Sequence, residues 1–143
     1  MVHALKEIWR VLVPDGILLD WRHLSTNCSM EVVSGGQVRL AGLLDDSMKM
    51  ENTDADKSLA QVVSEGWFVF KRRQSFDYAW HWDTLDEMKA HTENPIEPNW
   101  RLPVIITQAV LTEAQRLVAQ SSENAKVCIR FNMVISQYRK RRV

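Results

Sequence analysis

The segment that decides the fold is ALKEIWRVLVPDGILLD, residues 4–20 of the chain. Its first half has apolar residues at the spacing of one helix face, which predicts an amphipathic helix packed on a sheet: Leu5, Ile8, Trp9 and Leu12. Pro14 favours extended backbone at the preceding residue and so ends the helix, and Asp15-Gly16 accepts turn dihedral angles. The continuous apolar run at residues 17–19 then predicts a strand that is covered on both faces.

Length and composition permit a single domain over residues 1–143. A chain of this size buries about two-thirds of its unfolded surface, so neither a metal nor a disulfide is needed to hold it together. Its 18 basic and 18 acidic residues balance, which argues against nucleic acid or an anionic membrane as a partner. We predict no membrane span and no signal peptide, and therefore a cytoplasmic protein in which Cys28 and Cys128 stay reduced.

The middle of the chain predicts a hairpin, a helix and a strand. Two strand-like segments flank Ser34-Gly35-Gly36, which is typical of a hairpin with a glycine turn. Residues 45–56 are polar and predict a loop, followed by a helix over about 55–64 that Gly66 ends. Alternating aromatic residues predict a strand over 67–82, interrupted by a bulge or turn at the basic group 71–73.

The last third predicts two helices and a long strand. Thr84 and Glu87 have the spacing of a capping box, so a short helix to about His91 should begin there. After a break at 94–99, Pro103 suits the first position of a helix running to about Gln120. The β-branched run at 104–106 leaves a strand there as an alternative. Alternation from Lys126 onward indicates a half-buried antiparallel strand to residue 139, with Val127, Ile129, Phe131, Met133 and Ile135 on its buried face.

Residues 7–20 resemble the helix before the fifth strand, the turn and the fifth strand itself in class I S-adenosylmethionine-dependent methyltransferases. The family sequence reads like E-I-x-R-V-L-x-P-G-G-x-L, and this chain departs from it at Asp15, which stands where the family has its first glycine. The resemblance implies an α/β fold: the carboxyl-terminal half of a Rossmann-like sheet, α+β by itself, with antiparallel strands and flanking helices. Residues 17–22, about 67–82 and 126–139 would be the fifth, sixth and seventh strands, the seventh lying antiparallel between the other two.

The same resemblance implies methyl transfer from S-adenosylmethionine to an unknown acceptor in the intact parent domain. In the family, a glycine-rich loop after the first strand and an acidic residue after the second hold this cofactor. We find neither feature in this chain. Its glycine pair, in Ser34-Gly35-Gly36, lacks the strand-loop-helix context that such a loop requires. No cofactor-binding residue is assigned, and we expect the isolated chain to be inactive.

The candidate site lies on the substrate side. Carboxyl ends of strands in open α/β sheets face the ligand crevice, which selects the residues that end the predicted fifth strand: Asp20, Trp21, Arg22 and His23. His23 could serve as a base or simply as a hydrogen-bonding residue. Asp20 and Arg22 could contact a ligand, or could pair with each other.

Three other groups of residues have a structural as well as a functional interpretation. His81 and His91 do not place two ligands on one helical turn with Asp83 and Glu87, so we predict no metal site. The tryptophans Trp80, Trp82 and Trp100 form either an aromatic ligand wall or part of the core. The basic residues 139–142 form either a phosphate-attracting group or a solvated terminus.

A homodimer is the partner we predict. The edge of the strand over residues 17–22 would otherwise expose unpaired backbone beside an apolar surface, and the helix face from Leu5 to Leu12 would be buried with it. The alternative to a methyltransferase-related protein is a noncatalytic α+β module that dimerises or binds a ligand or partner through its aromatic face.

Overall fold

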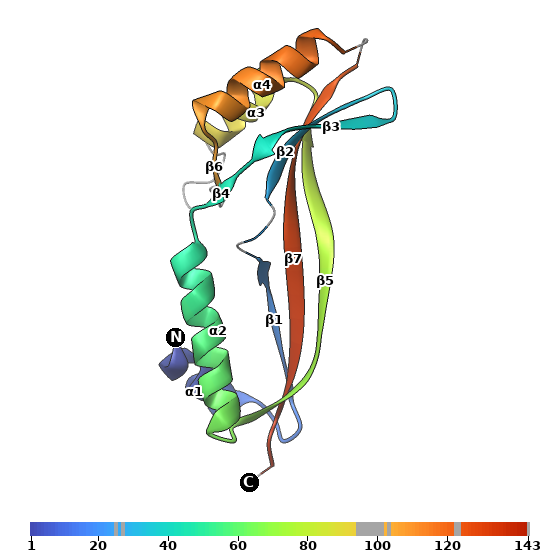
Figure 1. Ribbon diagram of the computed structural model, residues 1–143. Helices are drawn as coiled ribbons and strands as arrows, with labels where there is room; N and C mark the ends of the chain where they lie inside the picture. Colours follow the sequence, from blue (N-terminus) through green and yellow to red (C-terminus); the bar gives the residue numbers. More distant parts are fainter. Residues whose placement is uncertain (25, 27, 94–101, 103, 122–123, 143) are drawn as a thin grey trace. The chain divides into compact units, whose positions relative to one another are not determined.

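The computed structural model describes residues 1–24, 26, 28–93, 102, 104–121 and 124–142. It is a mixed α/β structure with four helices and antiparallel strand pairs among these residues. The residues form two compact units (Figure 1): unit 1 contains residues 1–24, 48–76 and 133–143, and unit 2 contains 25–47 and 77–132. The long strands β5 (Phe68–Trp82) and β7 (Lys126–Lys140) contribute residues to both units.

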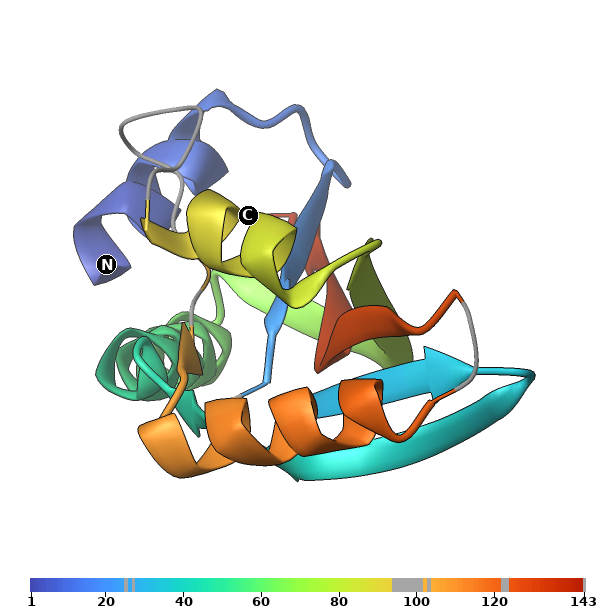
Figure 2. The ribbon, with the colours of Figure 1, turned by 90° about the horizontal axis from the view of Figure 1, so that it is seen from above.

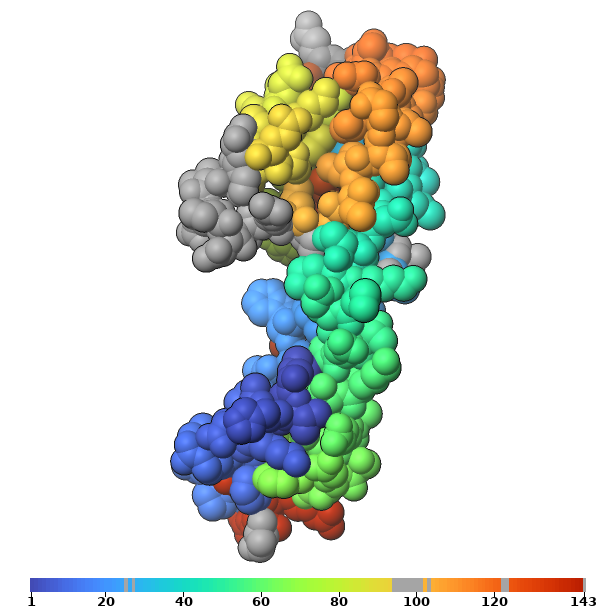
Figure 3. All heavy atoms as spheres, turned by 90° about the vertical axis from the view of Figure 1, so that its left-hand side faces the viewer, coloured from blue at the N-terminus to red at the C-terminus, as the bar shows by residue number. Residues whose placement is uncertain are grey.

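Unit 1 places two helices on one face of its strands. Helix α1 (Val2–Val11) packs against α2 (Lys49–Ser64), as the space-filling view shows (Figure 3), and β1 (Ile17–His23) pairs antiparallel with the end of β7. The buried core of the unit comes from both helices and from the strand residues that face them: Leu5, Leu59, Val62, Phe68 and Tyr138. The predicted helix, turn and strand at the start of the chain are therefore confirmed.

The turn between α1 and β1 depends on its two small residues. Asp15 has a φ of 62°, in the left-handed region that Asp tolerates better than most residues. A Cβ on Gly16 would lie 2.8 Å from the carbonyl oxygen of Val13, which accepts the Gly16 N–H at 2.9 Å. Only glycine fits this closely packed position without a shift of the backbone.

The prediction that β1 is covered on both faces is wrong. Leu18 points toward the helices and joins the core, whereas Ile17 and Leu19 are more than half exposed. The apolar run therefore has one face against α1 and α2 and one face that no described residue covers. Strand alternation, rather than burial on two sides, gives the pattern.

Helix α2 begins earlier than predicted. It starts at Lys49, so residues 49–56 are helical and not a loop, although Gly66, with a φ of 80°, ends the helix as expected. The buried stripe of α2 contains polar residues as well as apolar ones, which hides the helical period in the sequence: Asn52, Ala55, Ser58, Leu59 and Val62. The predicted interruption of the next strand is also wrong, because β5 runs without a break through residues 71–73.

Unit 2 is built on a hairpin. Strands β2 (Ser29–Ser34) and β3 (Gln37–Leu43) are joined through Gly35 and Gly36, both at positive φ, and β2 pairs antiparallel with the start of β7. Helix α4 (Gln108–Ala119) lies along this hairpin (Figure 2), where a Cβ on Gly42 would come within 2.6 Å of Val110. The predicted hairpin with a glycine turn is confirmed.

The remaining elements of unit 2 confirm the predicted cap at Thr84 and correct the predicted start of the last helix. Helix α3 (Leu85–Glu93) begins with the expected cap, since Thr84 accepts a hydrogen bond from the N–H of Glu87 at 3.1 Å. Pro103, the predicted first residue of the next helix, lies outside the described residues. Val104–Ile105 instead form the short strand β6, paired with β4 (Asp45–Asp46), and α4 begins after Thr107. The β-branched side chains at this point favour the strand, which was the alternative.

The predicted long strand is β7, but its buried face changes along its length. In unit 2 it buries Val127, Ile129 and Phe131, as the alternation predicts, but Cys128 on the opposite face is buried as well, so the strand is covered on both faces there. In unit 1 the buried residues of the strand are at even positions: Val134, Ser136 and Tyr138. Met133 and Ile135 are therefore only half-buried, because the helices of unit 1 lie on the face that Tyr138 presents.

Candidate functional site

The four candidate residues end β1 and divide between its two faces. Asp20 and Arg22 lie on the face toward α2, with side-chain exposures of 16% and 12%, while Trp21 lies on the opposite face and is 67% exposed. His23 is the last residue of the strand and also reaches α2. The structure thus brings three of the four together and leaves Trp21 apart from them.

Arg22 is the centre of this cluster. Its Nε donates to both carboxylate oxygens of Asp20, at 3.1 and 3.0 Å, and one Nη donates to the backbone carbonyl of Asn52 at 2.8 Å. The other Nη donates to Asp56 of α2. Burial opposes the charged form of Arg22, but its bonds to Asp56 and Asp20 outweigh this effect, so its pKa is raised.

His23 is engaged by the same turn of α2. The side-chain amide nitrogen of Asn52 lies 3.2 Å from Nε2 of His23. Because an amide nitrogen only donates, Nε2 must accept this bond, and the neutral ring then carries its proton on Nδ1. In this arrangement neither ring nitrogen offers an open lone pair, so His23 would have to release Asn52 before it could act as a base.

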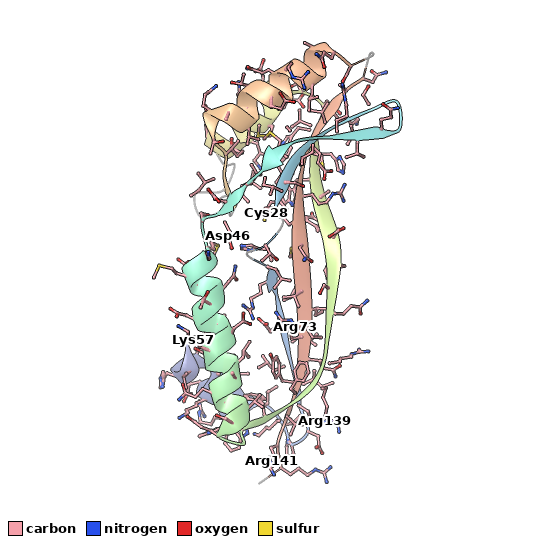
Figure 4. The ribbon with its side chains drawn as sticks, in the orientation of Figure 1. Cys28, Asp46, Lys57, Arg73, Arg139 and Arg141 are labelled. Atoms are coloured by element: carbon pink, nitrogen blue, oxygen red, sulfur yellow. The ribbon has the colours of Figure 1, made fainter. Side chains whose placement is uncertain are left out.

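The charges of the cluster balance. Arg22 and Arg73 face the carboxylates Asp20 and Asp56, with a nitrogen of Arg73 3.9 Å from Asp56. Figure 4 labels Arg73, which comes from β5. Two cations matched by two anions leave no excess charge for an ionic substrate, so the cluster ties β1 to α2 and presents a polar but neutral surface.

Sequence reasoning missed Asn52, Asp56 and Arg73. Both α2 residues fell in the segment predicted as a loop, so nothing placed them beside the strand. The available signal was their spacing of four, which puts them on one face of a helix. Arg73 was included only in a supposed interruption of its strand.

Trp21 belongs to a different surface, the apolar face of β1. Ile17, Leu19 and Trp21 alternate along the strand and are 51%, 57% and 67% exposed. Among the residues that the structure describes, β1 pairs only with β7, so its outer edge keeps free backbone groups. An apolar strip beside an open edge is a typical site for association with another protein surface.

The other sequence candidates are part of the framework of unit 2. Trp82 is 8% exposed, donates its indole N–H to Nδ1 of His91 at 3.1 Å and stacks with Trp80, so these rings belong largely to the core. Trp100 lies outside the described residues. Within the described part of the chain, no group of three His, Cys, Asp or Glu side chains could hold a metal ion. Cys28 and Cys128 are buried free thiols.

No described helix is both long and apolar enough to cross a membrane. Comparisons with the models of known protein families, with curated proteins and with solved structures found no match.

Proposed function

We propose that this chain is the carboxyl-terminal part of a class I methyltransferase-like domain, related to enzymes that transfer a methyl group from S-adenosylmethionine to an acceptor. The observation that carries the proposal is the strand order in which β7 pairs with both β1 and β5. In the family that residues 7–20 resemble, the last strand lies between the fifth and the sixth. The finer assignment, half of a Rossmann-like sheet, rests on this order and on the helix and turn before β1.

The described residues do not fit the cofactor. S-adenosylmethionine carries an activated methyl group, so the protein must chiefly bind and align it. The only Gly-Gly pair of the described chain, Gly35-Gly36, forms the hairpin turn between β2 and β3 rather than a loop before a helix. The cluster around Arg22 is closed on itself by internal hydrogen bonds. We therefore propose no methyl transfer by this chain alone.

What the chain would supply is part of the acceptor side. Of the four residues at the end of β1, Trp21 is the one whose side chain is mostly exposed. An exposed indole at the carboxyl end of such a strand offers a flat apolar surface to a substrate. Asp20 and Arg22 would act indirectly, by fixing the end of the strand against α2.

Two measurements test the proposal. Calorimetric titration of the purified chain with S-adenosylmethionine and S-adenosylhomocysteine should give no saturable heat, and saturable binding would show that the chain holds a cofactor site by itself. Sequencing of the genomic DNA upstream of the coding region should reveal an in-frame segment encoding a glycine-rich strand-loop-helix unit. Its absence there would contradict a methyltransferase parent.

The second candidate function is a dimerisation module, and the exposed strip of Ile17, Leu19 and Trp21 favours it. The predicted helix face cannot contribute without rearrangement, because Leu5 is 5% exposed and Ile8, Trp9 and Leu12 pack on the core of unit 1. The proposed homodimer therefore uses the outer edge and apolar face of β1. Full burial of a large apolar side chain contributes about 1.5–3 kcal/mol, so three such residues from each copy would stabilise a dimer appreciably.

Light scattering on the purified chain and two variants tests this dimer. Leu19→Lys places a charge in the strip and should give a monomer. Val13→Lys is the matched control, because Val13 is 70% exposed but precedes the strand, and this variant should remain dimeric. A monomeric wild-type chain at micromolar concentration, or equal dissociation of both variants, would contradict the proposed interface.

A further inference from the structure

The end of unit 1 away from Asp20–His23 contains a basic pocket that the proposed function does not use. Its volume is about 320 Å³. The lining residues come from α1, from the turn after it and from the end of the chain: Trp9, Pro14, Lys140, Arg141 and Arg142. The pocket lies at the start of β1, where the N–H of Lys140 donates to the carbonyl of Gly16 at 2.8 Å. Figure 4 labels Arg141 at this end of the chain.

Trp9 forms one wall of the pocket and is fixed by its neighbours. This ring meets Trp67 edge to face, with centroids 4.9 Å apart, and Lys140 lies over it with its ammonium nitrogen 4.4 Å from the centroid. The ammonium group also donates to the carbonyl of Leu12 at 2.6 Å. Lys140 is therefore fixed by a cation–π contact and a hydrogen bond, and no ion pair joins it to an acid among the described residues.

The pocket has an excess of positive charge. Arg142 pairs with Asp15. No described acid lies within ion-pair distance of Arg141, although its backbone N–H is held by the carbonyl of Trp67 at 3.0 Å. Three cations against one carboxylate leave a net charge of about +2 at the pocket, in a chain whose total charge is zero.

One of the lining residues, Trp9, also has a hydrogen-bond donor without an acceptor. The indole N–H of Trp9 is buried and has no partner in the described structure. An unpaired buried donor is unfavourable, and an oxygen that reached the edge of the ring would satisfy it. The pocket thus combines uncancelled cations with apolar surface from Trp9 and Pro14, and the unpaired indole N–H of Trp9 gives a signal that reports on contacts to this ring.

We propose that this pocket binds the phosphate monoester of a small molecule. The guanidinium of Arg141 has the forked geometry that matches phosphate oxygens, and Lys140 adds a fixed point charge. The apolar remainder of the ligand would lie against Pro14 and the exposed part of Trp9. A volume of about 320 Å³ is at the small end of ligand pockets, which suits a compact monoester. This site is independent of the methyltransferase proposal, since it involves none of the residues at the end of β1.

The test is an NMR titration of the ¹⁵N-labelled chain with phenyl phosphate at low salt, following the indole N–H signal of Trp9. The signal is assigned with the Trp9→Phe variant, and inorganic phosphate and phenol are titrated separately. We expect saturable shifts with phenyl phosphate, weaker binding of inorganic phosphate and none of phenol. Arg141→Gln should weaken phenyl phosphate binding about tenfold, the typical effect of one charge-assisted hydrogen bond.

Arg139→Gln is the matched control. Arg139 is exposed and pairs across the sheet with Ile17, on the face away from the helices, so its loss should change affinity by less than about threefold. Equal losses in the two arginine variants would indicate diffuse attraction to a basic terminus and overturn the site. Equal affinity for inorganic phosphate and phenyl phosphate would overturn the assignment to a monoester, and binding of phenol would overturn the requirement for an anion.

Discussion

Replacing Arg22 with methionine should destabilise unit 1 by about 2–4 kcal/mol. Methionine keeps much of the length and apolar contact of the side chain but removes the donors to Asp20, Asn52 and Asp56. Breaking a buried ion pair on one side costs about 3–5 kcal/mol, because the remaining charge stays uncompensated. Asp20 retains 16% exposure, so we lower that range by about 1 kcal/mol for partial solvation.

Urea denaturation, followed by circular dichroism and tryptophan fluorescence, measures this effect. With a slope of about 2 kcal/mol per molar urea, in the middle of the usual range, the midpoint should fall by roughly 1–2 M. Asp56→Asn is the control, since Asp56 is 53% exposed and its loss should cost at most about 1 kcal/mol. The reasoning fails if Arg22→Met costs less than Asp56→Asn. It also fails if the double variant Arg22→Met, Asp20→Asn is no more stable than Arg22→Met, because the unpaired carboxylate of Asp20 would then carry no energetic cost.

Three further predictions concern unit 2. Gly42→Ala brings a Cβ within 2.6 Å of Val110 and should cost about 1–3 kcal/mol in urea denaturation, a loss that Val110→Ala in the same chain should reduce. Burial raises the pKa of Cys128 from 9.0 to about 11. As the pH rises, the thiol of the unfolded chain therefore ionises before that of the folded chain. The contribution of Cys128 to the free energy of unfolding is complete below pH 9 and is lost as the pH rises toward 11. The free energy of unfolding of Cys128→Ala should therefore fall less between pH 9 and 11 than that of the wild type, and an equal fall would contradict the raised pKa. Thr84→Ala removes the acceptor for the Glu87 N–H and should cost about 1 kcal/mol by the same assay, whereas Thr84→Ser should cost little.

The sequence predicted the elements whose cause is local. The turn at Asp15-Gly16, the hairpin at Gly35-Gly36 and the cap at Thr84 each depend on the conformation or side chain of one or two residues. Such features need no knowledge of what packs against them. Helix α2 and the start of α4 failed because their limits depend on tertiary contacts, which stabilise a polar stripe in α2 and a short strand at Val104–Ile105.

From the sequence, the candidate site could be located and the pairing of Asp20 with Arg22 foreseen as one of two interpretations, but the contacts from α2 could not be predicted. Its position at the end of β1 follows from a strand prediction that is confirmed. Its chemistry depends on Asn52 and Asp56, which lie 30 or more residues away and reach Arg22 only because α2 packs beside the strand. No pattern in residues 17–23 indicates that Arg22 is neutralised from both sides.

The apolar run of β1 has an exposed face that requires a physical explanation. Burial on both faces was the natural prediction for Ile17-Leu18-Leu19, yet the described residues cover only the face of Leu18. An exposed, alternating apolar face next to an open strand edge is unfavourable for a protein that remains alone in water. In both proposed functions this apolar face is covered, either by the rest of a methyltransferase sheet or by a second copy of the chain. They differ in stoichiometry, because the first requires a different polypeptide segment and the second requires a two-fold symmetric contact. The effect of Leu19→Lys on self-association therefore separates them: a wild-type dimer that this variant disrupts favours the module, while a monomer that aggregates through this face favours the incomplete sheet.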